Sequence, residues 1–600
     1  MAEEGIRRGI LFFLAVMLIV AAFLSGVSFI PYEIVRHKLD LITVDGTADV
    51  FTEALFNNIA VWFRFLSALL FLGAIALFSI RRRLAEFIID LANDSAFFIK
   101  SATAYFTVGV RREEKAHLGL LMAAIYAGAV IRLLYINQPM RIDECFTFTN
   151  CASHPFYMCM SQYLSTNNHL FHTFFVRISY LIFGNDPWAL RLPALLAGVL
   201  MIPVSYILAR RFYGKYAAII GAFLVSFSAP LIAYSANSRG YTMLGLITLL
   251  AFCLATYLRK SSNLFAWLLF SVISALGLYT IPIMIYPLGL VVSWLFLSIL
   301  SDNAEPSYRR RLTASLLFSV IAAAAITIIL YIPVFIVSFA DIVSSSHYAL
   351  EGMRGWSFLS TLQNIVSHIN AAASEWNGGM TSEVKVLIFA AFLISIFAHR
   401  KISRYHLHPF LGVVLWIIPA LLIQGYVGVF PRIWLFLLPL YLLCASCGIA
   451  YILRVAGLYT SRYKNLVLGT FLAGLSAILA FNIIYTKAVY PVYYGSLLDD
   501  ADAVTKYLKT ILRRGDVVIS PHHNTVVLEY YFDKNKVDPE CWKTASVGSS
   551  DHVFLVLPDY DYNEIRRYLT SSDLISSHYE KPDIVKVFPS STVYGIKRRR

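Results

Sequence analysis

Residues 282–300 read PIMIYPLGLVVSWLFLSIL, a stretch without a charged side chain. As a helix, a stretch of this length crosses the roughly 30 Å hydrocarbon core of a membrane. Similar apolar stretches recur on both sides of it. Hydrophobic residues make up 58% of the 600 residues and charged residues 14%, and the mean hydropathy is +0.66. A soluble domain is about half apolar and about a quarter charged, so the sequence predicts an α-helical polytopic membrane protein.

The formal net charge of +14 is distributed in a way that indicates membrane topology. Short basic clusters lie between the apolar stretches, as expected for cytoplasmic loops that face anionic lipid. We therefore expect membrane lipids, and no nucleic acid, as partners of these charges. The clusters are Arg81–Arg83, Arg111–Arg112, Arg210–Arg211, Arg259–Lys260, Arg309–Arg311, Arg400–Lys401, and Arg462 with Lys464.

The positive-inside rule orders the apolar stretches into about thirteen transmembrane helices with a cytoplasmic start. The first is long and lacks a small-x-small cleavage site, which favours a retained span over a cleaved signal peptide. Residues 84–110 mix apolar and charged side chains and are predicted to lie at the interface. The predicted spans lie near 10–30, 60–80, 117–136, 188–210, 216–234, 241–258, 264–280, 282–300, 313–338, 384–398, 409–430, 433–454 and 465–485.

Two long loops are predicted outside, at residues 137–187 and roughly 341–383. Within the first, Leu170–Phe183 is apolar but too short to span, which favours a helix on the membrane surface. Three domains follow: a two-span extension (1–116), a transmembrane core (117–486) and an extracytoplasmic α/β domain (487–600). No internal repeat is present.

The alternation of patterns after residue 487 predicts the α/β domain. Asp499 to Asp516 has the pattern of an amphipathic helix that leads into a strand, Val517–Ile519. Val553–Leu557 indicates a second strand, and Asp561–Leu569 a second helix.

Acidic residues are absent from most of the predicted spans. No Asp or Glu occurs from Pro187 through Ser301, nor from Val384 through Leu498. Proton- and cation-coupled transporters usually carry intramembrane carboxylates. This distribution argues against that class.

An acidic pair, Asp143-Glu144, follows the 117–136 span directly. A carboxylate at a membrane surface can act as a general base toward a hydroxyl, although solvated loop charges are the simpler explanation for such a pair. Asn167-Asn168-His169 begins the predicted surface helix. Here Asn can cap the helix, or Asn168 and His169 can contact a phosphate or a sugar.

Isolated arginines in short outside loops are a stronger signal, because such loops are normally poor in basic residues. Arg239 and Arg432 are two cases, and Arg191, at the outside end of the 188–210 span, is a weaker one. Arginine suits phosphate because it donates two parallel hydrogen bonds. The alternative is snorkelling to lipid headgroups.

Seven cysteines are present. Cys145, Cys151 and Cys159 share the first outside loop, where a disulfide between two of them is possible but the pair is not specified. The sequence pattern assigns Cys253, Cys444 and Cys447 to apolar spans, where packing is the expected role.

The order of these motifs resembles the GT-C superfamily of membrane glycosyltransferases, in particular the branch of protein O-mannosyltransferases and lipid A aminoarabinose transferases. Over roughly residues 117–455 the chain shows that branch's Asp-Glu pair, its Asn-His segment, a Gly-x-x-x-x-Ala-x-Arg-Leu-Pro stretch, an Arg-Gly-Tyr loop and a later Pro-Arg. They appear as Asp143-Glu144, Asn168-His169, Gly184 to Pro193, Arg239-Gly-Tyr241 and Pro431-Arg432. Where many relatives continue His-Pro-Pro, this chain has His169-Leu-Phe.

The resemblance implies a mannosyltransferase-like enzyme that moves a sugar from a polyprenyl-phosphate donor to a glycan, lipid or protein acceptor, with inversion. Asp143 is then the base, and Glu144 orients Asp143 or the acceptor. Arg239, Tyr241, Arg432, His169, Asn168 and Arg191 are implied to bind the donor's phosphate and sugar. The implied location is the inner (plasma) membrane, with the active site extracytoplasmic.

The first outside loop lacks the Asp-x-Asp motif of relatives that use a metal and pyrophosphate-linked donors. No cofactor is therefore required, and no metal ligand is assigned, although a divalent metal is not excluded. An oligosaccharide transferase or O-antigen ligase with a pyrophosphate donor, a lipid or sugar transporter, and a noncatalytic assembly protein are the alternatives.

Overall fold

The computed structural model describes residues 2–41, 51–112, 114–163, 167–351, 358–424, 431–458, 463–489, 498–520, 522–538, 542, 552–558 and 582–598. The chain divides into two compact units, residues 1–109 with 263–266, and residues 110–262 with 267–600. Each is described by itself. The domain boundaries expected at residues 116 and 486 remain predictions.

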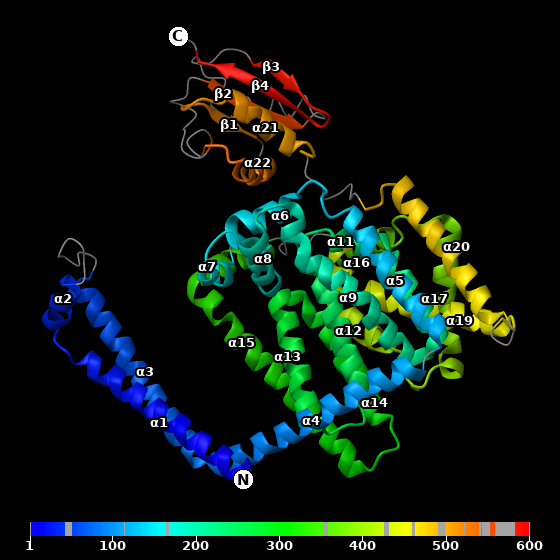
Figure 1. Ribbon diagram of the computed structural model, residues 1–600, viewed down its shortest axis with the longest axis horizontal. Coiled ribbons are helices and arrows are strands. Elements are labelled where there is room, and N and C mark those ends of the chain that lie inside the picture. Colours follow the sequence, from blue (N-terminus) through cyan, green and yellow to red (C-terminus); the bar gives the residue numbers. More distant parts are fainter. Residues whose placement is uncertain are drawn as a thin grey trace. The chain divides into compact units, whose positions relative to one another are not determined.

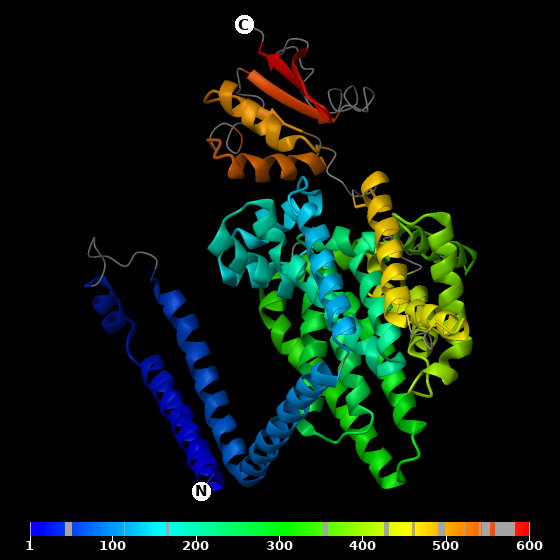
Figure 2. The same cartoon turned by 45° about the vertical axis from the view of Figure 1, so that its right-hand side comes forward.

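The N-terminal unit contains the helices α1 (Ala2–Ser28), α2 (Tyr32–Asp40), α3 (Glu53–Ser79) and most of α4 (Arg81–Arg112). Helices α1 and α3 run antiparallel along each other (Figure 2). Their shared core includes Leu14 and Ala74, and Ser67 donates a hydrogen bond to the carbonyl of Ala21. α4 covers the segment that the sequence indicated as interfacial, as one continuous helix.

The second unit is a bundle of long helices with shorter ones at one end (Figure 1). Its long helices and their partners are α5 (Lys115–Leu134), α9 (Pro187–Tyr213), α10 (Lys215–Ser226), α11 (Ala229–Ser235), α12 (Tyr241–Leu258), α13 (Leu264–Thr280), η2 (Pro282–Met284), α14 (Ile285–Leu300), α15 (Pro306–Glu351), α17 (Ser382–Ile402), α18 (Phe410–Gln424), α19 (Leu437–Val455) and α20 (Lys464–Tyr485). The shorter elements are α6 (Ile142–Thr147), η1 (Phe148–Ala152), α7 (Phe156–Ser161), α8 (Leu170–Phe183), α16 (Phe358–Trp376) and η4 (Pro431–Trp434).

Within the described residues, ten helices are long and apolar enough to cross a membrane, or eleven if the bent pair α10–α11 is one span. The chain is therefore a multi-pass membrane protein. The predicted number of thirteen is not confirmed, although each predicted stretch contains a helix. Two of those helices are short, α13 with 17 residues and α18 with 15, and residues 425–430 lie outside the described part.

The bend between α10 and α11 has a local cause. Pro230 cannot donate the backbone hydrogen bond that would continue the helix, and the two helices meet at 58°. The buried guanidinium of Arg132 then donates to the freed carbonyls of Val225 and Ser226, at 3.2 and 3.0 Å. It also donates to the hydroxyl of Ser235 on α11, at 3.1 Å. A charged group in the predicted 117–136 span thus fixes the broken helix.

The two expected outside segments differ in outcome. α8 has the bounds predicted from the sequence, Leu170–Phe183. The second segment, expected as a loop over 341–383, is largely helical, because α15 continues to Glu351 and α16 follows. α16 contains no Pro or Gly, and it buries His368 and Ala372 on one side. The position of this segment outside the membrane stays a prediction.

The C-terminal part is a small α/β domain of α21 (Ala501–Ile511), β1 (Val517–Ile519), α22 (His522–Lys534), β2 (His552–Pro558), β3 (Asp583–Val587) and β4 (Ser591–Lys597). The strand order is β1-β2-β4-β3. β1 and β2 are parallel, and the β2–β4 and β4–β3 pairs are antiparallel. Both helices pack against the sheet (Figure 1).

The predicted fold class, a polytopic helical protein with a small α/β domain, is therefore confirmed. Both predicted strands are present. α22, β3 and β4 were not predicted, and the helix expected at 561–569 lies outside the described residues.

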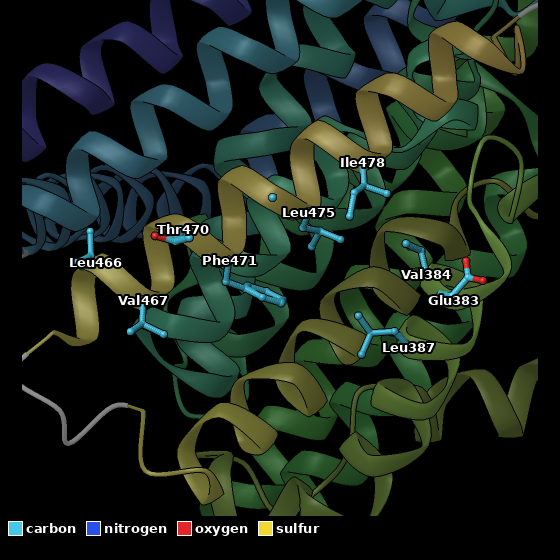
Figure 3. A pocket seen from close by; sticks show the side chains of 10 residues that line it. Glu383, Val384, Leu387, Leu466, Val467, Thr470, Phe471, Leu475 and Ile478 are labelled. Atoms are coloured by element: carbon cyan, nitrogen blue, oxygen red, sulfur yellow. The ribbon is translucent and has the colours of Figure 1, made fainter.

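An open apolar groove of about 650 Å³ separates α17 from α20 (Figure 3). None of the candidate site residues lines it. Its lining residues are Glu383, Val384, Leu387, Leu466, Val467, Thr470, Phe471, Gly474, Leu475 and Ile478.

Candidate active site

The acidic pair begins α6, where consecutive side chains diverge by about 100° around the helix axis. This divergence separates two carboxylates that are adjacent in sequence. Glu144 is 1% exposed, whereas the side chain of Asp143 is 28% exposed and lines a small cavity. Only Asp143 is therefore available to a substrate.

Glu144 is fully occupied by hydrogen bonds. Its two oxygens accept from Nε and Nη2 of Arg191, at 2.8 and 2.7 Å. They also accept from the backbone amides of Arg141 and Ser238. Burial alone would raise the pKa of Glu144, but the charge and hydrogen bonds of Arg191 outweigh it and hold that pKa below its ordinary value.

All three guanidinium nitrogens of Arg191 also donate hydrogen bonds. Besides Glu144, its guanidinium donates to the carbonyls of Ile136, Gln138 and Pro139, at 2.8, 2.6 and 3.0 Å. The side chain is completely buried. The structure thus gives Arg191 the task of fixing the segment before α6. Its implied role as a donor-phosphate ligand is not compatible with these contacts.

Asp143 is paired with Arg432. Nη1 of Arg432, on η4, lies 2.8 Å from Oδ2 of Asp143, and Nδ2 of Asn167 lies 3.4 Å from Oδ1. Asp143 and Arg432 are 289 residues apart in the sequence. The folded chain therefore joins two motifs that the sequence showed only separately.

Arg239 lies beside this pair and is 2% exposed. Its Nη1 donates to the hydroxyl of Thr147 and to the carbonyl of Asn167, at 3.0 and 2.7 Å. Its Nη2 donates to Oδ1 of Asn167, at 3.0 Å, and lies 3.2 Å from Nε2 of His169.

His169 faces Arg239 with a nitrogen that carries a proton. Its Nδ1 accepts a hydrogen bond from the amide of Gly240, at 2.8 Å. A neutral imidazole has one donor and one acceptor nitrogen, so Nε2 is the donor. Burial and the charge of Arg239 hold the pKa of His169 well below its ordinary value, which keeps the ring neutral.

Tyr241 and Asn168 complete the set. The ring of Tyr241 packs edge-on against His169, and its centroid lies 5.9 Å from the guanidinium carbon of Arg432 and 6.0 Å from that of Arg239. Asn168 donates to the carbonyls of Cys159 and Gln162. It does not cap α8, because His169 occupies the cap position without a side-chain hydrogen bond. The capping interpretation is corrected accordingly.

These elements enclose a cavity of about 20 Å³, room for about one water molecule. A larger ligand requires the walls to move apart. The lining residues are Arg141, Asp143, Tyr234, Asn237, Arg239, Tyr241 and Arg432.

Several of these residues were not singled out as site residues from the sequence. Arg141 and Asn237 lie two residues before Asp143 and Arg239, and Tyr234 lies five residues before Arg239. Glu375, on α16, lies in the segment expected to be an outside loop, where no sequence signal marked it.

Cys145, Cys151 and Cys159 are buried and free. The possible disulfide among them is therefore not formed in the structure. Within the described ranges, no group of three or more His, Cys, Asp or Glu side chains is arranged to hold a metal ion.

Fold and site together define a class: a multi-pass helical membrane protein in which a carboxylate and several arginines share a closed cavity. Residues 168–336 match the family model described as "Dolichyl-phosphate-mannose-protein mannosyltransferase". This match confirms the resemblance to the protein O-mannosyltransferase branch of the GT-C superfamily. It includes Asn168, His169, Arg191, Arg239 and Tyr241. Among curated proteins, none matches the chain.

Solved structures of membrane glycosyltransferases are also similar to the chain. ArnT from Cupriavidus metallidurans bound to undecaprenyl phosphate matches with a TM-score of 0.49 and 13% identity, over 80% of this chain and 98% of that one. AglB from Archaeoglobus fulgidus is an archaeal oligosaccharyltransferase, solved in complex with an inhibitory peptide and a dolichol-phosphate. It matches with a TM-score of 0.43 and 12% identity, over 72% of this chain and 65% of that one. The arabinosyltransferase EmbB from Mycobacterium smegmatis matches with a TM-score of 0.37 and 13% identity, over 80% of this chain and 46% of that one.

Proposed function

We propose that this protein is a glycosyltransferase that moves a sugar from a polyprenyl-phosphate donor to a hydroxyl of an acceptor, on the extracytoplasmic side of the inner membrane. The observation that carries the proposal is the placement of Asp143 and three arginines, Arg141, Arg239 and Arg432, around one cavity. A base beside a cluster of phosphate-binding cations is what transfer from a lipid phosphate requires.

The phosphate of the donor is placed at Arg239, Arg432 and His169. Arg239 supplies charge at this point, and His169 lies beside it, with Nε2 3.2 Å from Nη2 of Arg239. Arg432 lines the same cavity and adds a second positive charge. Donors arranged beforehand in this way stabilise the charge that develops on a leaving phosphate, each by about 3 kcal/mol.

Asp143 is the base in this proposal. The donor phosphate competes with Asp143 for Arg432, and the released carboxylate takes the proton of the acceptor hydroxyl. The hydroxyl oxygen forms a bond to the anomeric carbon, while the bond between that carbon and the phosphate oxygen breaks. Polyprenyl phosphate leaves with the electron pair, and the anomeric configuration is inverted.

Glu144 and Arg191 act as positioning residues in the same proposal. Their buried ion pair holds the start of α6 and the loop that contains Ser238, and so fixes the direction of Asp143. The small α/β domain is proposed to help select the acceptor, because α22 contacts the segment just before α6.

The test is release of polyprenyl phosphate by the protein in lipid nanodiscs. Polyprenyl-phosphate sugars, hexoses and pentoses, are offered one at a time with membrane extract as acceptor, with and without EDTA. Asp143→Asn is expected to lower release from the active donor at least about 100-fold, as on loss of a general base. Arg239→Ala is expected to lower it on the scale of one lost phosphate donor, about 100-fold.

Asp302→Asn is the matched control, because Asp302 pairs with Arg259 and Lys260 at the C-terminal end of α12, whereas the cavity residue Tyr241 begins that helix. Its rate is expected to equal that of the wild type. Absence of release from every monophosphate donor, or an unchanged rate in Asp143→Asn, would overturn the proposal. Release that requires a metal and a pyrophosphate donor would favour the oligosaccharide transferase alternative.

A further inference from the structure

Arg141 is a buried arginine of the cavity whose charge has no paired carboxylate. The residue is 6% exposed and lines the cavity. Nη2 of its guanidinium is buried and has no hydrogen-bond partner among the described residues. The two acids that follow it in sequence form ion pairs with other arginines, Glu144 with Arg191 and Asp143 with Arg432. An unpaired buried charge is costly, so the position calls for an explanation.

Asn237 is a second cavity residue with an unpaired buried atom. It is also 6% exposed and lines the same cavity. Its side-chain oxygen, Oδ1, is buried and has no hydrogen-bond partner within the described chain. Buried polar atoms are nearly always paired in folded proteins, and each unpaired one lowers stability. Two such residues at one cavity indicate that their partners belong to a ligand.

The other two arginines of the cavity are already engaged by the protein. Nη1 and Nη2 of Arg239 donate hydrogen bonds to Thr147 and Asn167, and Arg432 holds Asp143. A ligand must compete with these contacts, whereas Nη2 of Arg141 can donate without giving up a hydrogen bond. Three arginines and a single acid line the cavity, so its charge favours an anion, and guanidinium groups are well suited to phosphate.

The two unpaired atoms require opposite partners. A guanidinium can only donate a hydrogen bond, and an amide oxygen can only accept one, so the ligand carries an anionic oxygen and a hydroxyl close together. A sugar bonded to a phosphate has both groups, whereas polyprenyl phosphate without its sugar has no hydroxyl on a sugar ring. Resting on the proposed function, we propose that Arg141 is a further ligand of the donor phosphate, and that Asn237 accepts a hydrogen bond from a hydroxyl of the transferred sugar.

The experiment measures equilibrium binding of two ligands, polyprenyl phosphate and the tightest-binding polyprenyl-phosphate sugar, to the protein in nanodiscs. Arg141→Met is expected to weaken both ligands at least about 10-fold, the scale of one lost hydrogen bond to a charged group. Arg141→Lys keeps the charge and is expected to lose less affinity. Asn237→Leu is expected to weaken the sugar-bearing ligand about 5-fold, as for one neutral hydrogen bond, and to leave polyprenyl phosphate unchanged.

Thermal unfolding separates this binding role from a structural one. Arg141→Met removes an unpaired buried charge, so its unfolding midpoint is expected to equal or exceed that of the wild type, as for residues kept for function at a cost in stability. Arg177→Met is the matched control. Nη1 of Arg177, on α8, donates to the carbonyls of Ala152 and Ser153, at 3.2 and 2.8 Å, and Arg177 does not line the cavity. Its midpoint is expected to fall while both affinities are kept.

Asn482→Leu, on α20, is the control for Asn237→Leu and is expected to keep both affinities. Unchanged binding of polyprenyl phosphate by Arg141→Met would overturn the phosphate assignment, and a midpoint that falls together with the affinity would give Arg141 a structural role instead. Equal effects of Asn237→Leu on the two ligands would overturn the sugar assignment. If the wild type releases no polyprenyl phosphate, the proposed function fails separately, and the binding comparison still decides the roles of Arg141 and Asn237.

Discussion

At the scale of single residues, the site depends on the different environments of two neighbouring carboxylates. Glu144 is buried against Arg191 and accepts four hydrogen bonds. Asp143 has one close charged partner, Arg432, and faces the cavity. A buried ion pair contributes little net stability when intact, but the loss of one partner leaves an uncompensated charge.

Glu144→Gln is therefore expected to destabilise the protein by about 3–5 kcal/mol, because Arg191 stays buried without a counter-charge. The measurement is the midpoint of thermal unfolding in detergent or nanodiscs. The double variant Glu144→Gln, Arg191→Met is expected to lose less stability than the single one, since no charge remains buried. Glu305→Gln, in the connection before α15, is the control. An unchanged midpoint in Glu144→Gln would contradict this structural role.

At the scale of elements, α17 and α19 pack closely because the residue of α19 at their contact is a glycine, Gly448. A Cβ added at Gly448 on α19 would lie 1.8 Å from the carbonyl oxygen of Ala391 on α17. Small residues allow helices in a membrane to approach in this way. Gly469 on α20, by contrast, has no atom within 4 Å of an added Cβ.

Gly448→Ala is expected to cost about 1–3 kcal/mol of stability, as for an overpacked contact. Gly469→Ala introduces the same methyl group in open space and is expected to be neutral or to stabilise its helix by up to about 1 kcal/mol. Paired thermal-unfolding measurements compare the two. A Gly448→Ala protein as stable as Gly469→Ala would show that α17 and α19 are farther apart than described.

Sequence patterns predict elements well where the signal is local. The bounds of α8 and the strands β1 and β2 follow from apolar runs and their flanking residues. The bend at α10–α11 does not, because it requires Arg132, which lies about 94 residues from the carbonyls that it binds. The packing of α16 against η4 and α11 was not predictable for the same reason, since these elements lie far apart in the chain.

The candidate site was likewise predictable only where the signal is local to the sequence. Asp143, Arg239 and Arg432 were singled out because their charges are unusual at a membrane surface. Their pairing was not predictable, and neither was the separation of Asp143 from Glu144, which depends on how α6 begins. Arg191 was grouped with the phosphate ligands because its position resembles theirs. Its actual partners are carbonyls and a carboxylate that only the folded chain brings together.

At the scale of the whole second unit, the α/β domain is joined through α22 to the segment around α6 that contains Asp143. The hydroxyl of Tyr531 accepts a hydrogen bond from the amide of Met140, at 3.0 Å. Tyr530 donates to the carbonyl of Asn185, and Nδ2 of Asn185 donates to Asp533, at 3.1 Å. The domain thus contacts the chain just before α6 and just before α9.

Tyr531→Phe is expected to leave the buried amide of Met140 unpaired, at a cost of about 1–3 kcal/mol. Hydrogen exchange of residues 139–147 is expected to accelerate, because their local opening becomes easier. Tyr507→Phe, on α21, changes a tyrosine whose ring contacts Phe588 within the same domain, and it should leave that exchange unchanged. Equal exchange in both variants would mean that the domain does not stabilise residues 139–147.

The ion pair between Asp143 and Arg432 has a kinetic consequence for the proposed reaction. While Arg432 holds the carboxylate, an arriving acceptor finds no free base, and only an anion that draws Arg432 away provides one. Donor addition therefore comes first and acceptor addition second, in a compulsory sequence. In initial-rate experiments, a dead-end analogue of the acceptor would then be uncompetitive with respect to the donor.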